Sequence, residues 1–345
     1  MHTMRKATYK SGVAGKSNAL KSAARARRFR CLLLAWYYAN KRDLPWRENR
    51  DPYRIWLSEI MLQQTRVAAV VGYYAKFLQR FPSVQKLAGA REESVLAAWS
   101  GLGYYRRARM LHAAAKVLVK AHGGIFPNTS EDLKKLPGIG RYTAAAIASI
   151  AFAQPVAVVD GNVERVLQRI AGREISGEHL WEEAQAILDR SQPGDFNQAM
   201  MELGASVCVP GQPVCHSCPV HSFCATRGPR QSAGKALRLR KREIAYMLRR
   251  KNGSVFLVRR AKNASLMPGM WELPELADKR YRKTKALLVL RHSITVTDYR
   301  VRVVEDISPE VTLNASAGKW IQEGRLAQLP LTGLTRKILR SLKVF

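Results

Sequence analysis

Four cysteines form a compact group in the second half of the chain and restrict how that region can fold. They follow the spacing C-x6-C-x2-C-x5-C, which places them all in one short loop: Cys208, Cys215, Cys218 and Cys224. Thiolates held this close together either bind a soft metal centre or oxidise to disulfides. The segment is therefore expected to fold around a small central group.

The uneven spacing favours an iron–sulfur cluster. Zinc sites usually pair two C-x2-C units across a longer insert, and here only Cys215 and Cys218 form such a unit. A 4Fe–4S cluster accepts uneven spacing and is the cofactor that we expect. Zinc remains the alternative, because His216 and His221 lie in the same loop.

The net charge points to a polyanionic partner. The 345 residues include 58 Lys and Arg against 26 Asp and Glu, which gives a formal charge of +32. So large an excess favours nucleic acid. A basic protein associated with ribosomes, or one that is merely soluble, is the alternative.

The sequence shows neither a membrane-helix pattern nor a signal-peptide pattern. No apolar run reaches the length of about 18 residues that a membrane helix needs, and the N-terminus has no apolar signal-peptide core. Clustered thiolates persist as metal ligands in a reducing compartment. We therefore expect a cytoplasmic, monomeric protein without a membrane segment. Cys31 stands alone in an apolar run and is predicted to be a buried core thiol.

Composition and periodicity divide the chain into four segments. Residues 1–30 carry nine Lys or Arg and no acid, which is typical of a disordered basic arm. Apolar residues three and four apart predict a mostly helical domain over residues 31–226. A basic linker follows at residues 227–241, and residues 242–345 are predicted to form a small α+β domain.

The predicted elements follow from the same periods. The expected helices are Phe29–Tyr38, Tyr53–Met61, Val67–Phe81, Val95–Trp99, Arg106–Ala121, Ser130–Leu136, Tyr142–Ala151, Val163–Ile170 and a closing one at Leu331–Leu342. A β-hairpin is predicted from Ile244–Leu248 and Val255–Arg259 around Asn252-Gly253, and further strands at Lys285–Leu290 and Thr295–Val304.

A glycine-containing turn lies between two of the predicted helices. The sequence Leu-Pro-Gly-Ile-Gly places Gly138 and Gly140 where backbone N–H groups are left bare at a helix N-terminus, a geometry that binds phosphate. In so basic a chain we favour a clamp on the DNA backbone. An ordinary turn between helices is the alternative.

Two acids lie in apolar surroundings. Glu59 has Trp56 and Ile60 as neighbours, and burial would raise its pKa and keep it protonated, as a general acid requires. A solvated helix glutamate is the alternative. Asp160 precedes a predicted helix, whose N-terminus favours the ionised form. Its alternative is a plain N-cap.

A further turn, Gly101–Arg107, combines glycines, the planar ring of Tyr104 and cations. A wedge that enters a base stack needs this combination. Taken alone, each aromatic residue in the chain is better explained as core.

These features together resemble the helix-hairpin-helix DNA glycosylase superfamily, and in detail its adenine DNA glycosylase branch, the MutY family. The matching motifs are LPWR at 44–47, WLSEIMLQQT at 56–65, GLGYY at 101–105, VDGNV at 159–163 and FNQAMMELGA at 196–205. The resemblance is dense over about residues 30–230. It implies a nucleoid-associated base-excision-repair enzyme that flips adenine, mispaired with 8-oxoguanine or guanine, out of double-stranded DNA and hydrolyses its N-glycosidic bond.

The resemblance also implies the catalytic residues. Glu59 would protonate adenine at N7, and Asp160 would stabilise the positive sugar by charge or by a transient covalent bond. Tyr142 and Asn162 would support these carboxylates. Related enzymes that also cut the DNA backbone carry a lysine where this chain has Tyr142, so little or no lyase activity is expected.

Other matching residues are implied in DNA binding. The adenine pocket would be lined by Arg42, Leu44 and Trp46. The space left in the duplex would be filled or wedged open by Gln64, Leu102 and Tyr104.

The last segment resembles a Nudix-type domain. Gly269 and Glu275 match the start of a Nudix box, but basic residues follow where glutamates would bind Mg²⁺. We therefore expect a reader of DNA damage rather than a hydrolase. The family commonly has Phe-Ser-His in the loop that contacts 8-oxoguanine, and this chain has Ile294-Thr295-Val296. Thr295 keeps a hydroxyl, whereas the histidine is lost, so a smaller preference for 8-oxoguanine over guanine is predicted.

Three rival functions are weighed against this one. A mismatch thymine glycosylase of the same superfamily also bears a tyrosine at the hairpin, but Glu59 and the C-terminal segment argue against it. A cluster-bearing DNA-binding or redox-sensing protein would not need both acids in their motifs. A Nudix hydrolase would need the missing glutamates.

Overall fold

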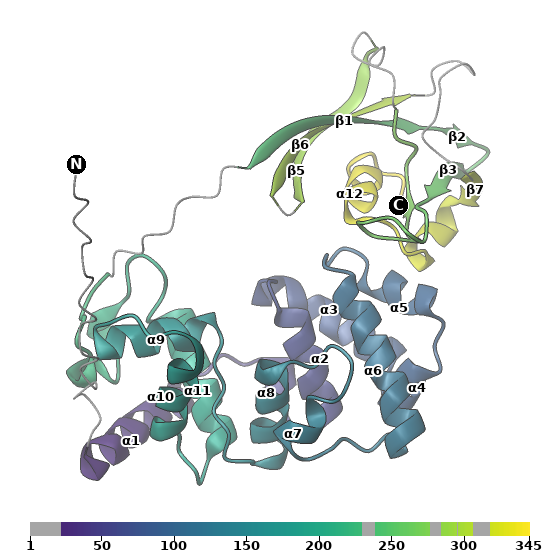
Figure 1. Cartoon of the computed structure of the whole chain (residues 1–345). Coiled ribbons are helices and arrows are strands. Elements are labelled where there is room, and N and C mark those ends of the chain that lie inside the picture. The colour runs from purple at the N-terminus through teal and green to yellow at the C-terminus, as the bar shows by residue number, and fades with distance from the viewer. Residues whose placement is uncertain (1–21, 230–238, 277–283, 295, 306–317) are drawn as a thin grey trace, which may run out of the picture. The chain divides into compact units, whose positions relative to one another are not determined.

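The computed structural model describes residues 22–229, 239–276, 284–294, 296–305 and 318–345 (Figure 1). The chain groups into two compact units. The first unit contains the residues up to Arg42 together with Ala153–Gln231, and the second contains Asp43–Phe152 together with Ser232–Phe345.

The first unit is helical. Its elements are α1 (Ala23–Asn40), α9 (Gly161–Ala171), α10 (Gly177–Ile187), α11 (Pro193–Ser206) and the 3-10 turns η2 (Cys215–Ser217) and η3 (His221–Phe223). Helix α11 contacts both α1 and α9. In the core the ring of Phe29 meets Phe223 edge-on, with centroids 5.5 Å apart, and Phe196 at 6.4 Å. The core therefore joins α1 and α11 to the cysteine loop.

Two predictions about the N-terminal part are wrong. The basic arm was expected to reach residue 30, but α1 begins at Ala23, where the hydroxyl of Ser22 accepts a hydrogen bond from the N–H of Arg25 at 3.2 Å. The rest of the predicted arm, residues 1–21, lies outside the described residues. Cys31 is exposed rather than buried, because the helical period places Phe29 and Leu33 on the buried face.

The second unit begins with a helical layer. Its elements are η1 (Pro45–Arg47), α2 (Pro52–Leu62), α3 (Val67–Arg80), α4 (Val84–Ala88), α5 (Glu92–Trp99), α6 (Arg106–His122), α7 (Ser130–Leu133) and α8 (Arg141–Phe152). Helix α2 starts with Pro52 at its first position, and the carboxylate of Asp51 accepts from the N–H of Tyr53 at 2.9 Å. Helix α8 packs against α2 and α7, and its buried face is largely alanine.

The predicted helices of both units are present with small shifts of their ends. Three further helices were missed. Helix α4 is only five residues long, α10 has its apolar residues diluted by acids, and α11 contains a proline and two glycines. In α11 the proline stands at the first helical position, where its missing N–H does no harm.

The C-terminal part of the second unit is a mixed β region with a helix. Its elements are β1 (Arg240–Leu248), β2 (Arg250–Lys251), β3 (Ser254–Arg259), β4 (Trp271–Glu272), β5 (Ala286–Ile294), β6 (Thr297–Glu305), β7 (Gly318–Gln322), η5 (Glu323–Gln328) and α12 (Gly333–Ser341). One sheet has the order β1-β6-β5, with β1 parallel and β5 antiparallel to β6. In the other, β3 pairs with β2, β4 and β7.

The predicted hairpin is partly wrong. Its turn is present, because Asn252 and Gly253 both adopt positive φ, as a two-residue hairpin turn requires. The strand that enters the turn, however, is the short β2. The predicted strand Ile244–Leu248 belongs to β1, which pairs with β6 in the other sheet.

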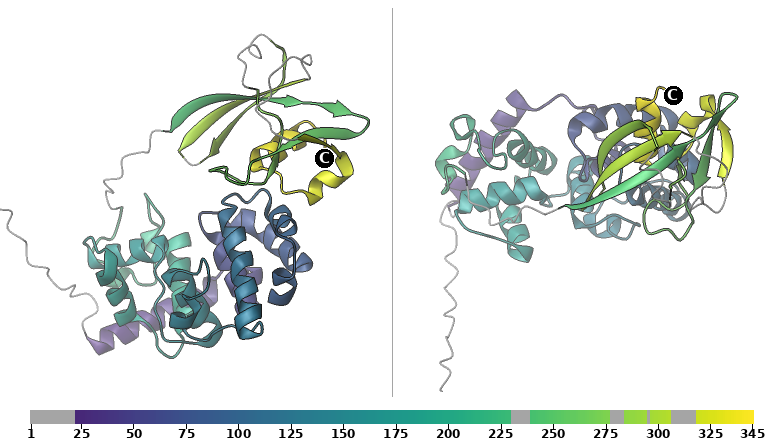
Figure 2. Two further views of the ribbon diagram at one scale, coloured as in Figure 1. Left: turned by 45° about the vertical axis from the view of Figure 1, so that its right-hand side comes forward. Right: turned by 90° about the horizontal axis from the view of Figure 1, so that it is seen from above.

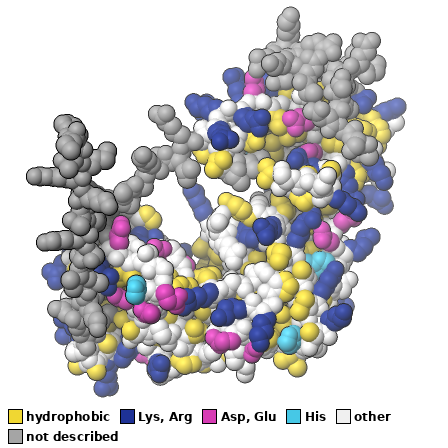
Figure 3. Space-filling view, viewed as in Figure 1, with side chains coloured by type: hydrophobic (Ala, Val, Ile, Leu, Met, Phe, Trp, Pro, Cys, Tyr) yellow, Lys and Arg dark blue, Asp and Glu magenta, His cyan; other side chains and the backbone are white. Residues whose placement is uncertain are grey.

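Helix α12 covers one face of the sheets (Figures 1 and 2). Its buried residues Leu334, Ile338 and Leu339 share a core with Val301 and Val303 of β6. The fold class predicted from the sequence, a helical domain followed by an α+β region, is confirmed. Within the described ranges, no helix combines the length and apolar character needed to cross a membrane. Lys and Arg side chains are spread over the face seen in Figure 3.

Candidate active site

Glu59 is buried on helix α2, with 6% of its surface exposed. The solvated alternative is therefore excluded. Its Oε2 accepts a hydrogen bond of 2.5 Å from the phenolic hydroxyl of Tyr142, the second residue of α8. The sequence predicted that Tyr142 supports this carboxylate, and the structure brings the two side chains together.

The glycine hairpin sets where α8 begins. Gly138 has φ +75°, and a Cβ placed on it would lie 2.6 Å from the Cβ of Met110. Only glycine fits both constraints. Gly140 has open space around its Cα and an ordinary φ. The structure therefore gives a local reason for Gly138 alone, while the predicted phosphate contact of both glycines stays a prediction.

Asp160 is the N-cap of α9. Its Oδ1 accepts from the N–H groups of Asn162 at 2.9 Å and Val163 at 2.8 Å, so the cap interpretation is correct. Its Oδ2 accepts from Nδ2 of Asn162 at 2.8 Å. Asn162 thus contacts this carboxylate, and its supporting role in catalysis stays a prediction. Asp160 and Asn162 belong to the first unit and Glu59 and Tyr142 to the second, so the convergence of the two acids on one nucleoside stays a prediction.

Arg165 connects Asp160's partner to the cysteine loop, a link that the sequence analysis missed. Its Nη2 donates to Oδ1 of Asn162 at 2.8 Å and to the carbonyl of Gly204 at 2.6 Å, and its Nε donates to the carbonyl of Cys208 at 2.7 Å. A Cβ on Gly204 would lie 2.6 Å from the Cβ of Asn162. Close approach of α11 to α9 therefore requires this glycine.

The four clustered cysteines lie near enough to influence one another's ionisation. Burial and the other three cysteines raise the pKa of Cys218 to about 11, and burial also raises that of Cys215. Nη1 of Arg169 donates to the sulfur of Cys208 at 3.3 Å, and the N–H of Arg227 donates to that of Cys224 at 3.4 Å. Thiolates with N–H donors around them are the ligand set of an iron–sulfur cluster.

The cysteine loop contains no disulfide, since all five cysteines are free. The zinc alternative included His216 and His221, and both side chains are exposed. Among the described residues, no three His, Cys, Asp or Glu side chains lie close enough together to hold a single metal ion.

The residues expected at the adenine pocket are divided between the units. Arg42, in the first unit, donates from Nε and Nη2 to Glu202 at 2.6 and 3.0 Å, and this hydrogen bonding raises the pKa of Arg42. Leu44 and Trp46, in the second unit, are buried, and the ring of Trp46 meets Tyr74 edge-on. Their predicted contact with adenine stays a prediction.

The predicted wedge residues differ in exposure. Tyr104 and Gln64 are exposed, and both have positive φ, +48° and +55°. Leu102 is buried in the free protein, with 7% of its surface exposed. Thr295 lies outside the described residues.

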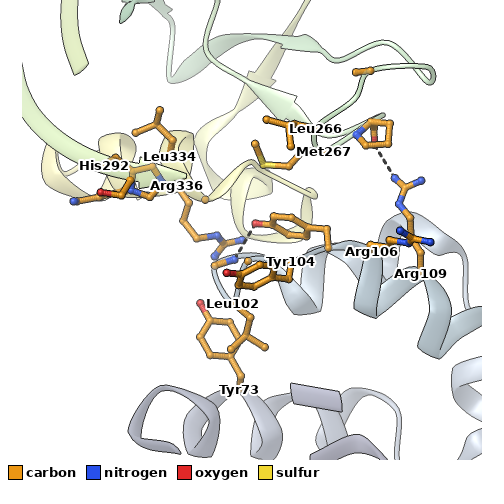
Figure 4. A pocket seen from close by; sticks show the side chains of 18 of the residues that line it. Tyr73, Leu102, Tyr104, Arg106, Arg109, Leu266, Met267, His292, Leu334 and Arg336 are labelled. Carbon is orange, nitrogen blue, oxygen red and sulfur yellow. Dashed lines mark hydrogen bonds between the residues drawn. The ribbon is translucent and has the colours of Figure 1, made fainter. Parts of the chain in front are cut away.

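A cavity of about 870 Å³ lies within the second unit beside the turn Gly101–Arg107, the wedge turn. Figure 4 shows Tyr73, Leu102 and Tyr104 on one side of it and Leu334 and Arg336 on the other. The two sides are joined by hydrogen bonds. The hydroxyl of Ser100 donates to the carbonyl of Leu331 at 2.7 Å, and Nε of Arg336 donates to that hydroxyl at 2.9 Å. The C-terminal region is thus fastened directly to the wedge turn.

Comparisons with known proteins agree with this architecture. The model of the HhH-GPD superfamily base excision DNA repair proteins matches residues 57–188. An adenine DNA glycosylase of Rattus norvegicus is 51% identical over 211 residues, which cover 57% of this chain and 41% of that protein. One of Arabidopsis thaliana is 39% identical over 294 residues, covering 71% and 46%. The chain thus spans about half the length of the curated relatives it matches.

A solved structure of a thermostable thymine-DNA glycosylase is also similar. It is 30% identical, with a TM-score of 0.55, and the match covers 59% of this chain and 96% of that one. These findings confirm the resemblance that the motifs indicated. The chain belongs to the HhH-GPD superfamily of base excision DNA repair proteins, and over part of its length it is similar to adenine DNA glycosylases.

Proposed function

We propose that this protein excises adenine mispaired with 8-oxoguanine or guanine in double-stranded DNA, by hydrolysing the N-glycosidic bond. The observation that carries the proposal is the buried Glu59, hydrogen-bonded to Tyr142 at the end of the glycine hairpin. A carboxyl group shielded from water and held by one partner suits a general acid. The adenine DNA glycosylases that the chain resembles support the choice of base.

The reaction needs a proton on the base and negative charge beneath the sugar. Glu59 would give a proton to N7 of the flipped adenine, which makes adenine a better leaving group. Asp160 would stabilise the positive sugar, by its charge or by a transient covalent bond, and Asn162 holds its Oδ2. General acid help of this kind contributes roughly 100- to 10,000-fold to a rate.

We infer that a 4Fe–4S cluster is held by Cys208, Cys215, Cys218 and Cys224. The four thiols repel one another as thiolates, so a cationic centre is needed to keep them deprotonated. The loop is tied to α9 through Arg165 and Arg169. When bound, the cluster would supply structural support to the helix whose N-cap is Asp160. A reducing cytoplasm, the compartment that we infer for this protein, would keep the four thiols available as ligands.

DNA would be held by the hairpin glycines Gly138 and Gly140 and opened by Gln64, Leu102 and Tyr104. Leu102 must leave its buried position to enter the duplex, whereas Tyr104 is already exposed. We infer that the C-terminal region is Nudix-like and reads the base opposite adenine. Loss of the loop histidine predicts a smaller preference for 8-oxoguanine, measurable as the ratio of single-turnover rates on A:8-oxoguanine and A:G duplexes.

Lyase activity is expected to be weak or absent. A Schiff-base mechanism needs an amine at the hairpin, and the hydroxyl of Tyr142 is engaged with Glu59. DNA treated with the protein should therefore break at the abasic site only after heating with alkali.

The test is a panel of labelled duplexes containing A:8-oxoguanine, A:G and T:G. The proposal expects alkali-dependent breaks at adenine in the first two, with free adenine released. Cleavage confined to T:G would instead assign a thymine glycosylase, the activity named for the similar solved structure. Binding without breaks in any duplex would assign a non-catalytic DNA-binding protein.

A further inference from the structure

Two of the wedge residues have the same unusual backbone. Gln64 and Tyr104 adopt φ of +55° and +48°, the left-handed region that side chains other than glycine rarely occupy. They lie in different turns, one after α2 and one before α6. Residues held in this region persist only when their surroundings enforce it.

One side chain, Arg107 of α6, fastens both turns. Its Nη2 donates to Oγ1 of Thr65 at 3.0 Å, just after Gln64, and to the carbonyl of Gly103 at 3.4 Å, just before Tyr104. Its Nη1 also donates to the carbonyl of Gln63.

The same guanidinium caps the helix that carries Glu59. Nη1 of Arg107 donates to the carbonyls of Ile60 and Met61, both at 2.9 Å. These are the two residues that follow Glu59 in α2. Carbonyls in the last turn of a helix have no partner within the helix, and a cation placed there is favourable.

Arg107 is also held by two rings. Its guanidinium carbon lies 5.3 Å from the ring centroid of Tyr104 and 5.5 Å from that of Trp99. Burial lowers its pKa to about 10, so it stays charged at neutral pH. A lysine has neither the planar group nor enough donors for these contacts.

We propose that Arg107 is a positioning residue that couples insertion of the wedge residues Gln64 and Tyr104 to the placement of Glu59. The inference rests on the proposed function. If DNA moved the turn of Gln64 or that of Tyr104, the rigid guanidinium group of Arg107 would transmit the movement to the end of α2. Base extrusion and placement of the acid would then occur as one event.

The test compares Arg107→Lys with Arg91→Lys, an exposed arginine of the same unit that lies outside the wedge turn. Three quantities are measured: the melting temperature, the single-turnover rate of adenine release, and the fluorescence of 2-aminopurine placed beside the target adenine, which reports unstacking. We expect Arg107→Lys to remain folded, to show less unstacking and to react about 10- to 100-fold more slowly. Arg91→Lys should match the wild type in unstacking and rate.

A double-mutant cycle with Tyr104→Ala separates coupling from general destabilisation. If Arg107 acts through the wedge, the double variant is no slower than the slower single variant. Additive losses, or wild-type unstacking and rate in Arg107→Lys, would overturn the inference. If Arg107→Lys fails to fold, Thr65→Val removes one acceptor only and must show the same reduced unstacking. A wild-type protein that releases no adenine would instead overturn the proposed function.

Discussion

The hydroxyl of Tyr142 donates a 2.5 Å hydrogen bond to Oε2 of Glu59, across 83 residues of sequence. This bond links the first turn of α8 to the last turn of α2. Tyr142 lies two residues after Gly140. The side chain of Tyr142 therefore connects the turn proposed to hold DNA with the proposed catalytic acid.

Removing this hydroxyl should slow adenine release. Tyr142→Phe leaves a buried carboxyl oxygen without its phenolic partner, so we expect a rate about 10-fold lower and a loss of about 1–2 kcal/mol in unfolding free energy. Single-turnover assays and denaturant titration measure both. Tyr38→Phe removes an exposed hydroxyl in the first unit and should leave the rate unchanged. An unchanged rate in Tyr142→Phe would show that the bond has no catalytic role.

The two hairpin glycines should respond differently to alanine. Gly138→Ala combines left-handed backbone with a contact of 2.6 Å to Met110, so the unfolding free energy should fall by about 1–3 kcal/mol. Gly140→Ala meets no atom within 4 Å and should change stability by much less. Equal melting temperatures for the two variants would contradict the geometry of the hairpin.

Close contact between α11 and α9 predicts a further contrast. Gly204→Ala would press on the Cβ and carbonyl oxygen of Asn162 and displace the partner of Asp160, so both stability and rate should fall. Gly72→Ala, on the exposed side of α3 with open space around it, should instead stabilise the protein by up to about 1 kcal/mol. Thermal melts and single-turnover rates compare the two, and full activity in Gly204→Ala would refute the predicted coupling.

Metal analysis tests the cysteine loop. The purified protein should contain four iron and four sulfide per chain, and Cys218→Ser should lose both together with stability of the first unit. Cys31→Ser, which changes an exposed cysteine outside the loop, should keep the full content. Stoichiometric zinc without iron would establish the alternative metal.

The acids of the C-terminal region predict a pH effect. Burial raises the pKa of Glu275 above its usual value, so the folded state disfavours the ionised form. The stability that this raised pKa contributes is fully present below the pKa of Glu275 in the unfolded chain. It is lost as pH rises through the pKa of Glu275 in the folded protein. Glu275→Gln should therefore raise the melting temperature at pH 7, with the difference shrinking toward pH 4. A difference that grows as pH falls would contradict this assignment.

Local patterns in the sequence predicted much of the site. The apolar neighbours of Glu59 indicated burial, and the glycine hairpin indicated the start of α8, because both depend on residues close in sequence. The contact between Glu59 and Tyr142 came from the family resemblance, since no local pattern joins residues so far apart. For Asp160 the structure shows the N-cap interpretation and a hydrogen bond from Asn162, while its catalytic role stays a prediction.

Long-range arginine contacts could not be predicted. Arg107 and Arg165 stand among many arginines in a chain of net charge +32, and nothing local marks the few whose guanidinium groups are buried against carbonyls. The pairing of β1 with β6 was missed for the same reason, since strand partners distant in sequence leave no periodic signal. Burial of Cys31 was wrong because an apolar run in a helix includes its exposed face.

The most direct test of the account is the single-turnover release of adenine from an A:8-oxoguanine duplex by Glu59→Gln, with duplex binding measured in parallel. The variant should bind DNA like the wild type and release no adenine above background, while Glu182→Gln, an exposed glutamate of α10, should react at the wild-type rate. Adenine release by Glu59→Gln at the wild-type rate would contradict the assignment of Glu59 as the catalytic acid.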